Sequence, residues 1–279
     1  MQPTIDEPFT AIKPDSTWNN STHFGTEYAA LLVEPGYRPP PTIEVLPSEG
    51  GDVVAVKSVH GEKGEQAVEG TLQFSGYEWH VRNVRSTRGG RDNNYDSANA
   101  WTDANGFLHL RISNNAGQWS CAEVRLLRSL GYGSYRFVVR DVSHLEPAAV
   151  LSIFTWDEAD AGQNHREMNI ELAKWGDAAS KNAQYVVQPY YVPANVVRFN
   201  VPAGVLAHSF RWDPGRVAFK TVRGSVADGP SLVADHVFTS GVPAPGGESI
   251  HLDLYIFGNA KNPLQKDAEV VIEKFEYLP

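Results

Sequence analysis

From about residue 71 onward the chain is a series of short alternating runs, and this rhythm restricts the fold more than any other feature. Each run places apolar side chains at every second position, and Gly, Pro, Asn or Asp separates it from the next. No segment keeps a helical period over a dozen residues. The runs that we expect to form strands are 106–113, 121–127, 133–142, 148–156, 167–173, 183–191, 208–213, 216–222, 249–257 and 268–278.

Many short strands at regular spacing are typical of two antiparallel sheets packed face to face. A length of 279 residues suits one large sandwich, and 42% hydrophobic residues can fill its core. The single cysteine, Cys121, excludes an intrachain disulfide and is expected to be a small core residue. We therefore predict an all-β domain over 71–279. Residues 1–70 carry weak signals and are expected to form an extension that wraps this domain, with a small separate module as the alternative.

The net charge and the hydropathy of the sequence limit the kinds of partner that the protein can bind. The net charge is -9 and the isoelectric point about 5.5, so the surface repels phosphate backbones and we expect no nucleic-acid partner. No run approaches the roughly 18 apolar residues of a membrane helix, so we expect no membrane partner either. The N-terminus has no basic start and no apolar run, and no targeting segment is visible.

The stretch "HREMNIELAKWGD", residues 165–177, puts polar residues at alternate positions of an apolar strand. Glu167, Asn169 and Glu171 project from one face, while Met168 and Ile170 point into the core. Burial of the two apolar side chains fixes the register, because a slip of one residue would bury the carboxylates. The polar face must then meet water or a ligand.

The two glutamates are spaced for a particular chemistry. Their α-carbons are roughly 13 Å apart in an extended strand, and on a concave sheet long side chains can lean towards each other. Retaining glycosidases need two carboxyl groups about 5 to 5.5 Å apart. If the alternating polar residues are considered without this chemistry, the alternative is that they form an ordinary solvent-exposed face of a strand.

The same stretch resembles the catalytic strand of family 16 glycoside hydrolases, the lichenase and laminarinase group, whose pattern is E-x-D-x-E. Here it reads E-M-N-I-E. Further segments resemble that family in the same order along residues 71–279. They are "WSCAEVRLLRSLGYGSYRFVVR" (119–140), "LSIFTWDE" (151–158), "NAQYVVQPYY" (182–191), "AHSFRWDPGRVAFKTVRG" (207–224), "SIHLDLYIFGN" (249–259) and "EVVIEKFEYL" (269–278).

The resemblance implies a concanavalin A-like β-jelly roll of two curved antiparallel sheets with a concave substrate cleft. It implies retaining, endo-type hydrolysis of a β-linked polysaccharide of the β-glucan or galactan class. By position, Glu167 matches the nucleophile, Glu171 the general acid/base and Asn169 the assisting Asp. The residues that match or are expected to join the substrate-binding cleft are Glu123, Arg125, Phe154, Trp156, Trp175, Gln184, Gln188 and His208.

The alternation of side chains along the strands supports part of this predicted set of cleft residues. Glu123 shares a face with Arg125, as Phe154 does with Trp156 and Gln184 with Gln188. Sugars need flat apolar surfaces for their C–H groups and polar partners for their hydroxyls. A core position is the alternative for Trp156 and Trp175, and a structural role is the alternative for His208.

Asn169 departs from the family pattern. An amide keeps the shape of Asp and can donate a hydrogen bond to Glu167, but it cannot ionise. Repulsion between like charges then falls, so Glu171 holds its proton less tightly than it would beside a third carboxylate. We expect a slower enzyme or a different pH optimum. Two smaller departures are Arg-Gly in "KTVRG", where the family often has Asp-Gly, and a tryptophan spacing in "HSFRW" that is one residue short.

Three classes of function remain at this point. The first is the retaining glycosidase, with a polysaccharide or oligosaccharide substrate. The second is a carbohydrate-binding pseudoenzyme with the same cleft, and the third is a structural or adhesive surface protein on the same sandwich. We expect no organic cofactor. Some family members carry a structural calcium, but no cluster of oxygen ligands stands out. From function alone we expect a secreted or periplasmic monomer whose signal peptide is absent from this sequence.

Overall fold

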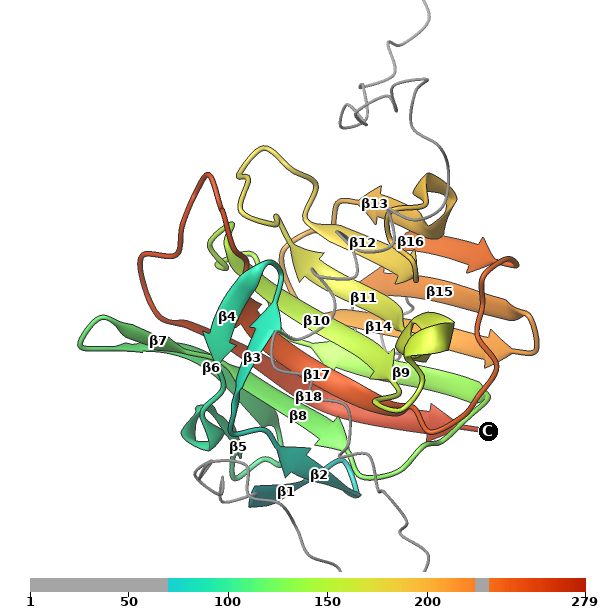
Figure 1. Ribbon diagram of the computed structural model, residues 1–279, viewed down its shortest axis with the longest axis horizontal. Coiled ribbons are helices and arrows are strands. Elements are labelled where there is room, and N and C mark those ends of the chain that lie inside the picture. Colours follow the sequence, from blue (N-terminus) through green and yellow to red (C-terminus); the bar gives the residue numbers. More distant parts are fainter. Residues whose placement is uncertain (1–69, 224–230) are drawn as a thin grey trace, which may run out of the picture.

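The computed structural model describes residues 70–223 and 231–279, and these form a sandwich of two large antiparallel sheets (Figure 1). The predicted fold class is therefore confirmed. The proposed N-terminal extension, residues 1–70, lies outside the described residues except for Gly70, which begins the first strand. Among the described residues, no helix is long and apolar enough to cross a membrane.

The first sheet carries the site. Its strands lie side by side in the order β1 (Gly70–Phe74), β2 (Tyr77–Val81), β8 (Ala122–Leu126), β17 (Ser249–Ile256), β10 (Ala149–Trp156), β11 (Met168–Ala173), β12 (Ala183–Val187) and β13 (Val196–Phe199). The central members are mostly buried, and β1 and β13 form the two edges of the sheet. The predicted strand 183–191 ends at Val187, shortly before Pro189, which has no N–H to donate to a ladder.

The second sheet covers the back of the first. Its order is β16 (Ser231–Phe238), β15 (Arg216–Arg223), β14 (Leu206–Asp213), β9 (Gly133–Val139), β18 (Ala268–Leu278), β6 (Leu108–Asn115) and β5 (Ala100–Thr102), and β7 (Gln118–Ser120) pairs with β6. Three short 3₁₀ helices lie in connections: η1 (Ser97–Asn99), η2 (Ala161–Arg166) and η3 (Pro193–Asn195).

A two-stranded hairpin, β3 (Arg85–Arg88) and β4 (Arg91–Asn94), stands apart from both sheets. In Figure 1 it crosses in front of the first sheet. Gly89 and Gly90 form its turn with φ of 54° and 73°, which is the backbone that a tight two-residue hairpin requires and that glycine adopts without strain. The sequence analysis predicted no strand here.

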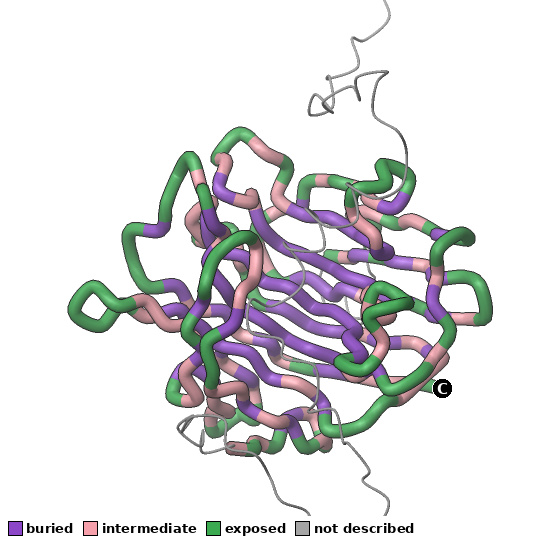
Figure 2. The backbone as a smooth tube through the Cα atoms, in the orientation of Figure 1, coloured by how far each residue is buried: buried purple, intermediate pink, exposed green. Residues whose placement is uncertain are grey.

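The core lies between the two sheets, and Figure 2 shows the centres of the strands in purple, as buried. Met168 and Ile170 are fully buried in it, as their alternation predicted. Tyr185 on β12 stacks on Phe219 of β15 with ring centroids 5.0 Å apart, and its hydroxyl lies 2.6 Å from Thr221 Oγ1. These contacts hold the polar residues of β11 and β12 on the opposite, outer face of the first sheet.

The core face of β11 can be tested by removing volume. Ile170→Ala should lower the free energy of unfolding by about 2 to 5 kcal/mol and Ile170→Val by about 0.5 to 1.5 kcal/mol, because both leave a cavity between the sheets. Lys220→Ala, at an exposed position of β15, should stay within about 0.5 kcal/mol of the wild type. Urea unfolding measures all three. Equal effects of Ile170→Ala and Lys220→Ala would show that Ile170 is not in the core.

Candidate active site

A row of polar side chains crosses the outer face of the first sheet. Strand pairing places Ser152 of β10 beside Glu171 of β11, and Glu171 beside Gln184 of β12. The row runs through directly paired positions in the order Glu123, Asp253, Ser152, Glu171, Gln184 and Arg198. Paired residues of neighbouring strands project to the same side, so six strands contribute to one polar surface.

A cavity of about 390 Å³ opens over part of this row. Strands β10, β11 and β12 supply its floor, the hairpin tip forms one wall, and Phe257, Gly258 and Asn259 form another. Of the residues predicted from sequence, those that line it are Phe154, Trp156, Glu167, Asn169, Glu171, Trp175, Gln184 and Gln188. The structure thus brings together all three residues predicted to be catalytic.

Glu167 lies where η2 ends and β11 begins. Its Oε1 accepts a hydrogen bond of 2.8 Å from Asn169 Nδ2. Burial of the carboxyl raises the pKa of Glu167 to about 7, although the hydrogen bonds from Asn169 and Gln188 act in the opposite direction. Near neutral pH this carboxyl is therefore divided between its neutral and charged forms.

Glu171 is held by a different set of donors. Trp175 Nε1 donates to Glu171 Oε2 at 2.9 Å, and Gln184 Nε2 donates to the same oxygen. Arg198 Nε in turn donates to Gln184 Oε1 at 3.0 Å, and its guanidinium lies 4.3 Å from the centroid of the Trp175 ring. Burial raises the pKa of Glu171 in spite of these donors, which suits a group that must deliver a proton.

Asn169 lies between the two glutamates. Besides its bond to Glu167, its side chain lowers the pKa of Glu171 through hydrogen bonding. One amide that interacts with both carboxyls shows that the two glutamates lie close together on the floor of the cavity, as a retaining pair requires. Its Oδ1 has no hydrogen-bond partner among the described residues.

The aromatic residues of the cavity are only partly available to a ligand. The imidazole of His165 stacks on the Trp156 ring with centroids 3.9 Å apart, so one face of that indole is already covered. Phe154 stacks on His251 at 5.0 Å. Trp175 is more exposed than either and also lines the cavity.

Three residues predicted to bind substrate do not line the cavity. Glu123 is on the expected face of the sheet but is buried, in contact with Arg82 and His251, and it does not line the cavity. Arg125, two residues further along β8, does not line it either. His208 lies on β14 in the second sheet, fully buried, with Nδ1 2.9 Å from Thr221 Oγ1 and away from the cavity.

The sequence analysis missed several residues of the cavity, including Asp253, Tyr255, Arg198 and Arg88. A signal for two of them was present, because Asp253 and Tyr255 alternate along "SIHLDLYIF". Arg198 is recognised only once β13 is seen to pair with β12. Among the described residues, no group of three or more His, Cys, Asp or Glu is arranged to hold a metal ion.

The raised pKa of Glu167 predicts a dependence of stability on pH. Its pKa in the folded protein, about 7, exceeds the ordinary value of 4.5, so the folded state binds this proton more tightly than the unfolded chain. The resulting stabilisation is complete below about pH 4.5 and is lost as the pH rises to about 7, at ~1.4 kcal/mol per pH unit. Glu167→Gln should therefore become more stable relative to the wild type across this window.

Urea unfolding of both proteins at a series of pH values measures this difference. The glutamine side chain keeps an oxygen for Asn169, so the variant isolates the charge. Two stability curves that run parallel between about pH 4.5 and 7 would contradict the raised pKa.

No family model matches the chain. No curated protein matches it either. Among solved structures, the β-glucanase of Bacillus licheniformis superposes with a TM-score of 0.57 and 16% identity, covering 77% of this chain and 100% of that chain. A protein described as an immunostimulatory antigen and pseudo β-1,3-glucanase of Mycobacterium tuberculosis gives a TM-score of 0.54 and 18% identity, covering 72% and 91%.

A family 16 glycosyl hydrolase from Mycobacterium smegmatis gives a TM-score of 0.54 and 14% identity, covering 72% of this chain and 91% of that chain. These identities are too low to transfer an activity. They show that this chain has the jelly-roll fold of the family 16 β-glucanases, which the sequence motifs resembled.

Proposed function

We propose that this protein is a retaining glycoside hydrolase that acts on a β-linked polysaccharide of the β-glucan or galactan class. The observation that carries the proposal is the pair Glu167 and Glu171, which lie on one strand in the cavity with Asn169 between them. Both carboxyls have raised pKa values, as is common at functional sites, and the raised pKa of Glu171 suits its role as proton donor. The fold of the chain supports the same proposal.

The reaction would proceed in two displacements. In the first, the ionised Glu167 attacks the anomeric carbon and forms a glycosyl ester, while Glu171 gives its proton to the departing glycosidic oxygen. In the second, Glu171, now ionised, takes a proton from water, and the water oxygen displaces Glu167 from the sugar. Glu167 leaves as a carboxylate and Glu171 is again protonated, so the enzyme returns to its starting state.

The neighbours of Glu171 act as positioning residues in this scheme. Trp175 and Gln184 fix one oxygen of the carboxyl, which leaves the other oxygen to carry the transferred proton. Both donors also stabilise the carboxylate that forms after the first step. Arg198 holds Gln184 in place and supplies a positive charge nearby.

A carbohydrate-binding pseudoenzyme is the second candidate, and Asn169 is the observation that favours it. The proton-exchanging Asp of the resembled motif is absent, while the cavity that would bind sugar is retained. The endo mode of attack predicted from the sequence stays a prediction.

Release of reducing ends separates the two candidates. The purified protein is incubated with β-glucans, xyloglucan, agar and carrageenan from about pH 4 to about pH 9, beside Glu167→Gln and Glu171→Gln. We expect release from one polysaccharide, with losses of ~10²-fold or more in both variants. Binding of a polysaccharide without release, at any pH in this range, would favour the pseudoenzyme.

The pH profile of the reaction follows from the pKa of Glu167. The nucleophile must be ionised and the acid protonated in the free enzyme, so kcat/KM should rise with pH as Glu167 ionises, around pH 7, and fall again as Glu171 loses its proton. Asn169→Asp should move the profile to higher pH, because a nearby carboxylate raises the pKa of both glutamates. Asn169→Ala is the matched control, since it removes the hydrogen bond without adding charge. A profile unchanged by Asn169→Asp would contradict the role given to Asn169.

A further inference from the structure

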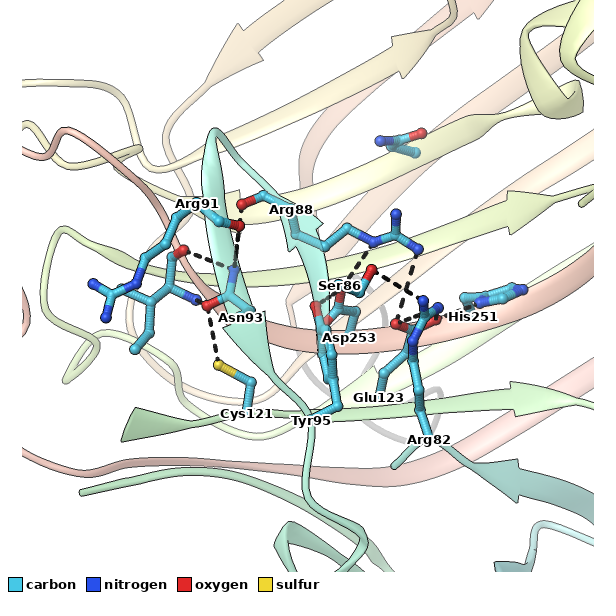
Figure 3. Close-up of polar contacts among 12 residues, drawn as sticks. Arg82, Ser86, Arg88, Arg91, Asn93, Tyr95, Cys121, Glu123, His251 and Asp253 are labelled. Atoms are coloured by element: carbon cyan, nitrogen blue, oxygen red, sulfur yellow. Dashed lines mark hydrogen bonds and ion pairs between the residues drawn. The ribbon is translucent and has the colours of Figure 1, made fainter. Parts of the chain in front are cut away.

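The hairpin β3–β4 covers the half of the concave face that lies beyond the cavity. Figure 3 shows it in front of β17, with Arg82 and Arg88 directed at carboxylates of the sheet below. Glu123, His251 and Asp253 project from β8 and β17 towards this side, and none is more than 1% exposed. The polar row of the sheet therefore lines the cavity from Asp253 to Arg198, whereas Glu123 does not line it.

Packing leaves no passage between the hairpin tip and the sheet. A methyl group at Gly89 would lie 2.6 Å from a ring carbon of Tyr255 and 3.0 Å from one of Phe257. Just beyond the end of β17, Gly258 N donates to Gly89 O at 2.8 Å, and a methyl group at Gly258 would lie 2.5 Å from Gly90 O. The backbones meet in direct contact, which only glycine permits at these positions.

Polar contacts tie Arg88 of the hairpin, and Arg82 and Tyr95 on either side of it, to buried groups of the sheet. Arg82 NH1 donates to Glu123 Oε1 at 3.2 Å, and His251 Nδ1 lies 2.7 Å from the same oxygen. Arg88 Nε lies 3.8 Å from Asp253 Oδ2, which also accepts a 3.0 Å bond from the Tyr95 hydroxyl. Glu123 and Asp253 are buried, so separating the hairpin from the sheet would remove the guanidinium of Arg88 from buried polar groups, at a cost of about 1 to 3 kcal/mol.

The side chain of Asn93 adds a second tie at the other end of the hairpin. Its Nδ2 donates to Ile256 O at 3.2 Å, and its Oδ1 accepts from Ile256 N at 3.3 Å. This amide pairs with the last residue of β17 as a neighbouring strand would. The hairpin is thus a fixed wall of the site.

We propose that this wall closes one side of the cleft, so that the site accepts the end of a polysaccharide chain and not its interior. Thr87, Arg88, Gly89 and Gly90 line the cavity where a through-running chain would have to pass. The volume of about 390 Å³ is near the lower limit of the range for small-molecule sites, which suits a few sugar units. The inference rests on the proposed function for its ligand class, and it replaces endo attack by release from a chain end.

The test compares the natural protein with a variant that lacks the wall. Arg85 and Asn94 are cross-strand partners, so a Gly-Gly turn can join them directly in place of residues 86–93. The matched control shortens a hairpin of the other sheet: Asn114 and Trp119 are also partners, and Gly-Gly replaces residues 115–118. Each is made with and without Glu167→Gln, and folding is checked by thermal unfolding.

Two readouts are used. The first is the size distribution of early products from the polysaccharide that releases reducing ends. The second is binding of linear β-1,3-glucan oligosaccharides and of a cyclic β-1,3-1,6-glucan, which has no ends, by tryptophan fluorescence of the Glu167→Gln proteins. We expect the natural protein and the control to give one short product and to bind only the linear form. The variant without the wall should give mixed sizes and bind both forms.

The outcomes separate this inference from the proposed function. Mixed product sizes from the natural protein, or equal binding of linear and cyclic glucan, would overturn the chain-end inference and leave the glycosidase intact. Binding of the linear form alone, without release from any polysaccharide, would reject the glycosidase and support the inference. Absence of both binding and release would contradict both. If the variant without the wall does not fold, the natural protein's products and binding still decide.

Discussion

The site depends first on the burial of Met168 and Ile170 between the two sheets. Each fully buried apolar side chain contributes roughly 1.5 to 3 kcal/mol, and a slip of one residue would exchange both for the neighbouring polar groups. Burying an unpaired carboxylate costs several kcal/mol more. The register of β11 is therefore fixed by its core face, and the positions of Glu167, Asn169 and Glu171 follow from it.

Strand pairing extends this constraint across the sheet into the row from Glu123 to Arg198. The two ends of the row differ in burial and in the ionisation of their side chains. Under the hairpin, burial alone would raise the pKa of Glu123, but Arg82 and His251 outweigh it and hold that pKa well below its usual range. For Asp253, burial and the charge of Glu123 raise the pKa well above its usual range. This end is a buried, internally compensated cluster, whereas the end from Ser152 to Arg198 faces the cavity.

Much of the fold followed from local alternation, because a half-buried strand records its core face at every second residue. The strands that were missed, such as β3, β4 and β13, are four residues long and mostly exposed or half-buried, so no alternation is developed. The Gly-Gly turn at 89–90 is a hairpin signal, but where a hairpin packs is decided by contacts distant in sequence.

The difference between local alternation and contacts distant in sequence also explains which residues of the site could be predicted. Parity along one strand placed Glu167, Asn169 and Glu171 on one face, and the cavity contains all three. Parity also placed Glu123 and Arg125 on one face, yet it carries no information about what covers that face. His208 was chosen from its motif alone, and its burial against Thr221 depends on the pairing of β14 with β15. The resemblance to a family therefore predicted the strands more accurately than it predicted which residues line the cavity.

Trapping of the covalent intermediate tests the central claim most directly. The protein is incubated with a 2-deoxy-2-fluoro glycoside of the sugar that it releases, carrying a good leaving group, and its peptides are examined by mass spectrometry. Our account predicts one added glycosyl group on Glu167, and none in Glu167→Gln. A label on Glu171, or turnover with inverted stereochemistry and no label, would contradict the roles assigned to the two carboxyls.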